Sequence, residues 1–103
     1  MDVSVVIPAR NEERTLPWVL RDLKDTIARM PRHEIEVICV DDHSTDATAS
    51  IARSFGVVVV ENPRRPGKGM ALRAGFERAK GDIIVMMDAD YSHRAEALPS
   101  FLD

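Results

Sequence analysis

The 103-residue chain lacks the features that mark several classes of protein. A single cysteine, Cys39, excludes an intrachain disulfide and a multi-cysteine zinc site. A chain without disulfides is typical of a reducing compartment. No apolar run approaches the ~20 residues of a membrane span, and the N-terminus lacks the basic start and long apolar stretch of a signal peptide. We therefore expect a cytoplasmic domain, in which Cys39 is a buried apolar residue.

The chain also has no excess of one charge. Fourteen basic and seventeen acidic residues give a net charge of −3. A general nucleic-acid binder needs a basic face, so we expect no nucleic-acid partner, whereas a site for one nucleotide needs only a few local groups. The length permits one domain over residues 1–103, and the 45% of hydrophobic residues argues against disorder.

Four apolar runs rich in β-branched residues predict strands, each near-continuously apolar and therefore expected to be buried on both faces. These runs are Val3–Ile7, Glu36–Val40, Val57–Val60 and Ile83–Met87. The segments between them predict helices over 16–30, 45–55 and 67–80, and a fourth helix begins near Arg94. Strands that alternate with helices predict a Rossmann-like α/β domain, with three α/β/α layers around a mainly parallel four-stranded sheet.

Local signals indicate how two of these helices begin, end and pack. Ser44 or Thr45 is placed to cap the helix over 45–55, and Gly56 is placed to end it. The apolar face that we expect for the helix over 67–80 consists of Leu72, Phe76 and Ala79.

Charged residues follow all four predicted strands, at the edge where open parallel sheets bind ligands. They include Arg10 and Glu12, Asp41 and Asp42, Arg64, Arg65 and Lys68, and Asp88 and Asp90. In an extended segment Asp88 and Asp90 point the same way, so one or both can reach a single Mg²⁺ or Mn²⁺ ion that also binds substrate phosphate. Acids two positions apart also occur as solvated loop residues, so the spacing alone leaves both interpretations open.

Four segments resemble, in order, the motifs of family 2 glycosyltransferases of the GT-A class. They are residues 3–12 (VSVVIPARNE), 40–48 (VDDHSTDAT), 67–76 (GKGMALRAGF) and 81–90 (GDIIVMMDAD). The variants are most similar to the dolichyl- and polyprenyl-phosphate mannosyl- or glucosyltransferase branch. The resemblance implies that the chain forms the N-terminal half of a GT-A fold.

The resemblance also implies site residues. Those expected to bind the nucleotide are Pro8, Ala9, Arg10, Glu12, Val40, Asp42, Lys68, Asp88 and Ala89, and those expected to bind Mg²⁺ or Mn²⁺ are Asp88 and Asp90. In this alignment Asp42 accepts a hydrogen bond from a ring N–H of the base. Its neighbour Asp41 points to the opposite side and is structural.

The implied function is inverting transfer of a hexose from a nucleotide diphosphate sugar, GDP-mannose or a UDP-sugar, to a polyprenyl phosphate or another acceptor. A lipid acceptor would place the domain at the cytoplasmic face of the membrane. No catalytic base is assignable in this chain, so we expect it to bind nucleotide without efficient turnover on its own. The alternative is a nucleotide-sugar-binding or interaction module without turnover. We also expect the fourth strand to be an uncovered edge, which favours homo-oligomers.

Overall fold

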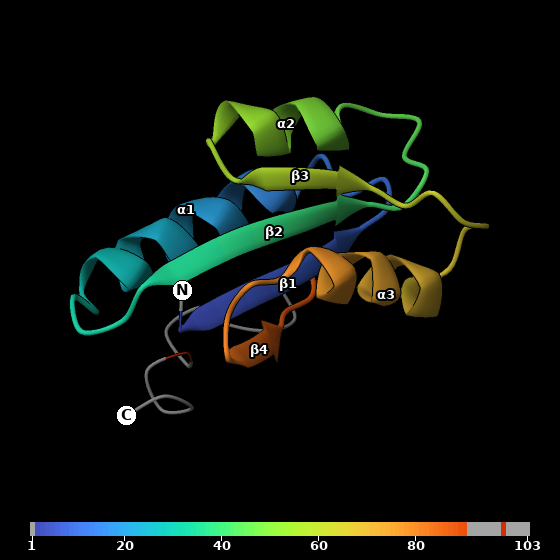
Figure 1. The fold of residues 1–103 in the computed structure, drawn as a ribbon. Coiled ribbons are helices and arrows are strands. Elements are labelled where there is room, and N and C mark those ends of the chain that lie inside the picture. The colour runs from blue at the N-terminus through green and yellow to red at the C-terminus, as the bar shows by residue number, and fades with distance from the viewer. Residues whose placement is uncertain (1, 91–97, 99–103) are drawn as a thin grey trace.

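The four strands form one parallel sheet in the order β3-β2-β1-β4, which confirms the predicted α/β class (Figure 1). The computed structural model describes residues 2–90 and 98, so the helix expected near Arg94 lies outside the described residues. The strands are β1 (Val3–Ala9), β2 (Ile35–Asp41), β3 (Val58–Glu61) and β4 (Ile83–Met86). The helices are α1 (Leu16–Ala28), α2 (Thr48–Ser54) and α3 (Lys68–Arg78). Within the described part of the chain, none of them is long and apolar enough to cross a membrane.

Alternate residues of the central strands face two separate hydrophobic clusters, one on each side of the sheet. Val5 and Ile7 pair with Val37 and Cys39 across β1 and β2, and these side chains pack with α1 and α2. Val6 and its neighbours pack against α3 on the other face. The three layers follow directly, with α1 and α2 on one side of the sheet and α3 on the other (Figure 1).

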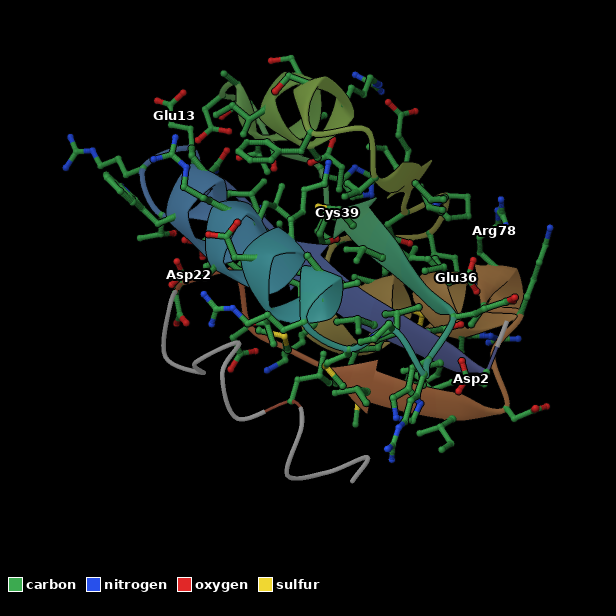
Figure 2. The ribbon with its side chains drawn as sticks, turned by 90° about the vertical axis from the view of Figure 1, so that its left-hand side faces the viewer. Asp2, Glu13, Asp22, Glu36, Cys39 and Arg78 are labelled. Atoms are coloured by element: carbon green, nitrogen blue, oxygen red, sulfur yellow. The ribbon has the colours of Figure 1, made fainter. Side chains whose placement is uncertain are left out.

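Cys39 lies inside the larger cluster, as its apolar surroundings in the sequence predict (Figure 2). Its side chain is fully buried. Burial raises the pKa of the Cys39 thiol to about 12, and the nearby charge of Asp41 acts in the same direction. The thiol is therefore protonated at neutral pH, which suits a core residue and not a metal ligand or a nucleophile.

The prediction that every strand is buried on both faces is wrong for the two edge strands. β1 and β2 are buried almost throughout, but β3 is half-buried. In β4, Ile83, Ile84 and Met86 are 49%, 41% and 54% exposed. An apolar run indicates that a strand can be buried but not what buries it, and α3 packs on β1, β2 and β3. The expected uncovered edge is present among the described residues, and self-association through it stays a prediction.

Helix α3 packs with only part of the predicted face. Leu72 and Ala79 pack, partly buried, against the cluster that contains Val6. Its buried residues are Ala71, Ala74 and Gly75, whereas Phe76 is 41% exposed. A Cβ at position 75 would overlap the Val6 side chain and lie 3.1 Å from Cγ2 of Val40. The small residues therefore let the helix approach the sheet closely, and hydrophobic size alone wrongly placed Phe76 in this contact.

A buried polar network holds the turn between α3 and β4 to the start of the sheet. The Ser4 hydroxyl donates to the Glu36 carboxylate, which also accepts from the Lys80 amide at 2.6 Å, and the Gly81 amide donates to Ser4 Oγ at 2.8 Å. Figure 2 shows Glu36 and Arg78 close together where β2 begins. Burial raises the pKa of Glu36, but the hydrogen bonds from Ser4 and Lys80 and the charge of Arg78 outweigh it, so the pKa lies below its usual value.

We predict opposite effects from two Gly→Ala changes in α3. Gly75→Ala should destabilise the fold by about 1–3 kcal/mol, because the added methyl overpacks the contact with the sheet. Gly69→Ala, with no other atom within 4 Å of the added Cβ, should be neutral or stabilising by up to about 1 kcal/mol. Urea denaturation measures both free energies of unfolding. Equal effects of the two changes would contradict the close helix–sheet contact.

The Glu36 network also predicts a pH dependence of stability. Because folding lowers the Glu36 pKa from 4.5, its contribution is present above that pH and is lost as the pH falls through the lower folded-state value. Glu36→Gln should therefore lose less stability than wild type between pH 6 and pH 3. Free energies of unfolding at several pH values give the comparison, and parallel curves for the two proteins would refute the assignment.

Candidate functional site

The sheet order creates a crevice at the carboxyl end of β1. The chain runs from β1 through β2 to β3 on one side and then crosses back to β4 on the other side. The strand order therefore reverses at β1, and open α/β sheets bind ligands outside the carboxyl ends of the strands at such a reversal. A pocket of about 240 Å³ lies at this edge.

This pocket brings together every predicted site residue except Val40. It is lined by Pro8, Ala9, Arg10, Glu12, Asp42, Lys68, Asp88, Ala89 and Asp90. The Val40 side chain is instead fully buried in the cluster that faces α3, beside Val6 and Ala71. Because residues alternate along β2, Val40 points into a layer of the core, and a contact of its side chain with a base is not supported.

The loops after β1 and β2 are tied together by reciprocal hydrogen bonds. The Asn11 amide donates to Ser44 Oγ at 3.0 Å, and the Thr45 amide donates to Asn11 Oδ1 at 2.8 Å. The Glu12 amide donates to the buried Thr48 hydroxyl at 2.9 Å. These contacts fix the backbone of Arg10 to Glu12 beside the second loop, so this wall of the pocket is held by polar groups rather than by core packing.

The same contacts correct the predicted start of α2. Ser44 and Thr45 do not cap this helix, because both bond to Asn11 in the neighbouring loop. The helix begins at Thr48, after a turn in which Asp46 accepts from the Thr48 amide at 2.9 Å. The Thr48 hydroxyl bond holds the pKa of Asp46 below its usual value, although desolvation opposes the shift. Gly56, with φ of 76°, follows the helix as predicted.

Thr15 connects the loop after β1 to the Asp-Ala-Asp segment. Its hydroxyl donates to the Ala89 carbonyl at 2.6 Å and lies 3.3 Å from a Glu12 carboxylate oxygen. The segment that carries Asp88 and Asp90 is thus attached to the residue before α1. Nothing in the local sequence around Thr15 indicates this role, because the contact spans 74 residues.

Asp42 forms the wall opposite the Asp-Ala-Asp segment and is only 5% exposed. Its carboxylate accepts from Asn62 Nδ2 at 2.9 Å and from the Gly67 amide at 3.0 Å. Its neighbour Asp41 accepts instead from the Ser44 amide at 3.2 Å and does not line the pocket. The two adjacent carboxylates therefore have different surroundings, as the alternation of side chains in a strand requires.

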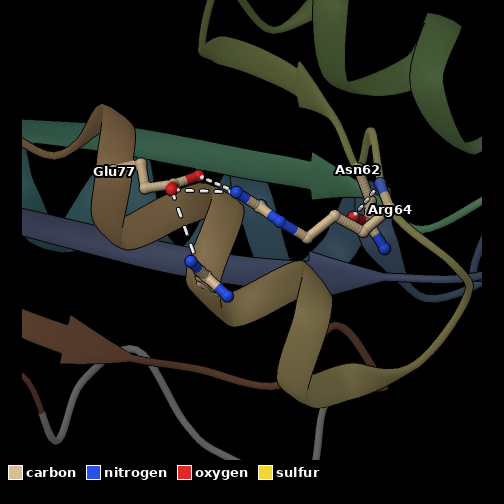
Figure 3. A network of polar contacts seen from close by, with 4 residues as sticks. Asn62, Arg64 and Glu77 are labelled. Carbon is tan, nitrogen blue, oxygen red and sulfur yellow. Dashed lines mark hydrogen bonds and ion pairs between the residues drawn. The ribbon is translucent and has the colours of Figure 1, made fainter.

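Only some of the predicted basic residues reach the pocket. Lys68 Nζ lies 2.9 Å from Asp88 Oδ1 at the pocket wall. Arg64 extends along α3 instead, where its Nη2 donates to both Glu77 oxygens at 2.9 and 3.0 Å (Figure 3). The Arg64 carbonyl lies 2.6 Å from His43 Nε2, and since a carbonyl only accepts, that nitrogen carries the proton. Among the described residues, Arg10 and Lys68 are the basic side chains that line the pocket.

The residues at the pocket suit a hard divalent cation that shares its ligands with a substrate. Over residues 2–90 and 98, no group of three or more His, Cys, Asp or Glu side chains is arranged to hold a metal by itself. Asp88 and Asp90 supply oxygen donors at the pocket, and two carboxylates leave positions for phosphate oxygens in an octahedral shell. The donor set therefore fits Mg²⁺ or Mn²⁺ bound together with a diphosphate.

Comparisons with known proteins agree with this arrangement. The model of the family "Glycosyl transferase family 2" matches residues 4–103. The chain is 39% identical over 103 residues to an undecaprenyl-phosphate 4-deoxy-4-formamido-L-arabinose transferase of Pseudomonas fluorescens. The matched region covers 94% of this chain and 30% of the relative. The chain belongs to glycosyl transferase family 2.

Solved structures show the same fold. Glucosyl-3-phosphoglycerate synthase from Mycobacterium tuberculosis, crystallised with Mn²⁺, uridine diphosphate and glucosyl-3-phosphoglycerate, gives a TM-score of 0.79 at 36% identity, over 95% of this chain and 37% of that one. Mannosyl-3-phosphoglycerate synthase from Rubrobacter xylanophilus gives a TM-score of 0.75 at 28% identity, over 87% of this chain and 31% of that one. The chain is thus a glycosyltransferase domain with a GT-A fold, and it spans 30% to 37% of the length of these three proteins.

The tie between the two loops yields a prediction about Thr48. Thr48→Val keeps the size of the side chain but leaves the Glu12 amide without its acceptor and removes the hydroxyl bond to Asp46, which together should cost about 1–3 kcal/mol of stability. Thr48→Ser keeps the hydroxyl and should cost about 1 kcal/mol for the lost methyl group. Chemical denaturation of the two variants provides the test, and a valine variant as stable as wild type would show that the loops do not depend on this contact.

Proposed function

We propose that this domain binds a uridine diphosphate sugar together with Mg²⁺ or Mn²⁺ and presents the sugar for inverting transfer to a polyprenyl phosphate. The observation that carries the proposal is the pocket itself. Asp88 and Asp90 follow β4 and the buried carboxylate of Asp42 follows β2, on opposite sides of β1, and Lys68 lines the same pocket. In a nucleotide diphosphate sugar, the base offers N–H donors that the Asp42 carboxylate can accept. The diphosphate is anionic, and it can bind Arg10, Lys68 and a metal ion held by Asp88 and Asp90.

The residues of the pocket divide this recognition between them. Asp42 offers a carboxylate oxygen to the N3–H of uracil, a donor that cytosine lacks. Arg10 and Lys68 supply positive charge for the diphosphate. Uracil is favoured over guanine because the Mycobacterium tuberculosis relative was crystallised with uridine diphosphate.

Asp88 and Asp90 would hold the cation, which offsets negative charge on the departing diphosphate when bound. Lys68, at 2.9 Å from Asp88, already keeps that side chain at the pocket wall. Thr15 holds the backbone between the two acids through the Ala89 carbonyl. The Asp88 side chain and the backbone beside Asp90 would therefore be partly ordered before the substrate binds, which lowers the cost of ordering them on binding.

The acceptor is proposed from the relatives. The Pseudomonas fluorescens relative is named for transfer to undecaprenyl phosphate, and it is 39% identical to this chain. An acceptor of this kind would place the domain at the cytoplasmic face of the membrane. The acceptor oxygen would attack the anomeric carbon opposite the departing diphosphate, which inverts the configuration.

Asp90 gives the first test of this proposal. Asp90→Asn removes a charged oxygen donor, so it should weaken the Mn²⁺-dependent binding of UDP by about tenfold or more. Asp82→Asn makes the same charge change on an exposed residue at the opposite end of β4, and should leave binding unchanged. Titration calorimetry of UDP with and without Mn²⁺ measures the effect. Unchanged metal dependence in the Asp90 variant would remove Asp90 from the metal site.

Asp42 gives the second test. A hydrogen bond to a buried carboxylate is worth about 1.5–3 kcal/mol, so Asp42→Ala should weaken UDP binding by roughly tenfold or more. Asp41→Asn, which keeps the oxygen that bonds to Ser44, should bind UDP like wild type. If both variants bind UDP as wild type does, Asp42 does not contact the base.

A further inference from the structure

Asn62 is a buried amide at the end of β3 whose side chain bonds both to Asp42 at the wall of the pocket and to the backbone of the loop after β3. Its side chain is 4% exposed. Its Nδ2 donates to Asp42 Oδ1 at 2.9 Å and to the Arg65 carbonyl at 3.1 Å, and its Oδ1 accepts from the Arg64 amide at 3.0 Å. Asn62 does not line the pocket itself, and the motifs of the sequence did not single it out.

Asn62 is also fixed through its backbone. Its amide donates to the Asp41 carbonyl at 3.0 Å, which continues the pairing of β2 and β3 by one residue. The side chain therefore has little freedom to follow a displaced Asp42. A donor held in this way sets the direction of the carboxylate that it contacts.

Two donors, from Asn62 and Gly67, hold the Asp42 carboxylate. Asn62 contacts Oδ1, and the Gly67 amide lies 3.0 Å from Oδ2 and 3.3 Å from Oδ1. An ionised carboxylate has about four acceptor positions, so these two donors leave acceptor positions for a ligand. Since Asp42 also lines the pocket, the remaining positions are available to a group bound there.

We infer that Asn62 is a positioning residue, which aims the Asp42 carboxylate at the base and so determines which base the domain prefers. The inference rests on the proposed function, in which Asp42 accepts from uracil N3–H. To position Asp42 in this way, one short side chain must donate a hydrogen bond to Asp42 and accept one from the Arg64 amide. Aspartate has the same shape as asparagine but no N–H, so it would turn the donor contact with Asp42 into a repulsion between carboxylates.

A second anchor of the same loop supplies a matched control. Arg64 is tied to α3 by its ion pair with Glu77, as Figure 3 shows beside Asn62. Glu77→Gln weakens this anchor without touching Asp42. A loss of loop order in general can therefore be separated from a loss of direction at Asp42.

The experiment compares UDP with CDP, two pyrimidine nucleotides that differ in whether N3 carries a hydrogen. Binding of each is measured by calorimetry with Mn²⁺ for wild type, Asn62→Asp and Glu77→Gln. Wild type should bind UDP about tenfold more tightly than CDP, because one hydrogen bond to a charged group distinguishes them. Asn62→Asp should reduce this ratio to within about threefold, and Glu77→Gln should retain it.

Three results would overturn the inference, and they differ from one another. Equal weakening of UDP and CDP in Asn62→Asp, with the ratio retained, would make Asn62 a structural residue only, while the proposed function stands. If Glu77→Gln also loses the preference for UDP over CDP, the preference depends on the order of the loop in general and not on Asn62. No preference of wild type for UDP would contradict base recognition by Asp42 and the inference together.

Wild-type protein offers a measurement that does not depend on the folding of a variant. The chain has two asparagines, Asn11 and Asn62, and no glutamine, so its nitrogen–proton spectrum contains two side-chain amide pairs. If uracil shares the Asp42 carboxylate with Asn62, UDP should shift the Asn62 pair more than CDP does at saturation. Equal shifts with the two nucleotides would overturn the inference.

Discussion

The central position of β1 is the constraint on which the rest of the domain depends. It pairs in parallel with β2 on one side and with β4 on the other. All three carboxyl ends therefore meet at one edge, and the Met87 amide continues the β4 pairing with a bond to Val6 that ends just before Asp88. A pocket that combines the segment after β1 with Asp42 and Asp88 exists because backbone hydrogen bonds align these strands.

Hydrogen bonds position the loops around the pocket, whereas apolar packing holds the strands of the sheet against the helices. Thr48 supports the loop after β1, Thr15 supports the Asp-Ala-Asp segment, and Asn62 supports Asp42. Each contact links segments from different strand ends. These fixed donors and acceptors add to the apolar packing of residues such as Ala89 and give the pocket its shape without filling it.

The arrangement of strands and the gathering of the charged residues could be predicted from the sequence. Apolar β-branched runs separated by helical segments leave few alternatives to a parallel sheet, and such a sheet brings the residues after its strands to one edge. The start of α2, the small residues of α3 that contact the sheet, and the contact of Asn62 with Asp42 could not be predicted. Ser44 bonds to a residue 33 positions away and Asn62 to one 20 positions away, so local preferences do not report these contacts.

Broadening of backbone amide signals by Mn²⁺ tests the central claim most directly, namely that a metal and a nucleoside diphosphate occupy one pocket at the carboxyl ends of β1, β2 and β4. Spectra are recorded with and without UDP, and with Mg²⁺ as the diamagnetic reference. The account predicts that with UDP, low concentrations of Mn²⁺ broaden residues 9–12, 67–68 and 88–90 first, and that this selectivity is weaker without UDP. Broadening centred elsewhere, or identical with and without UDP, would contradict the account.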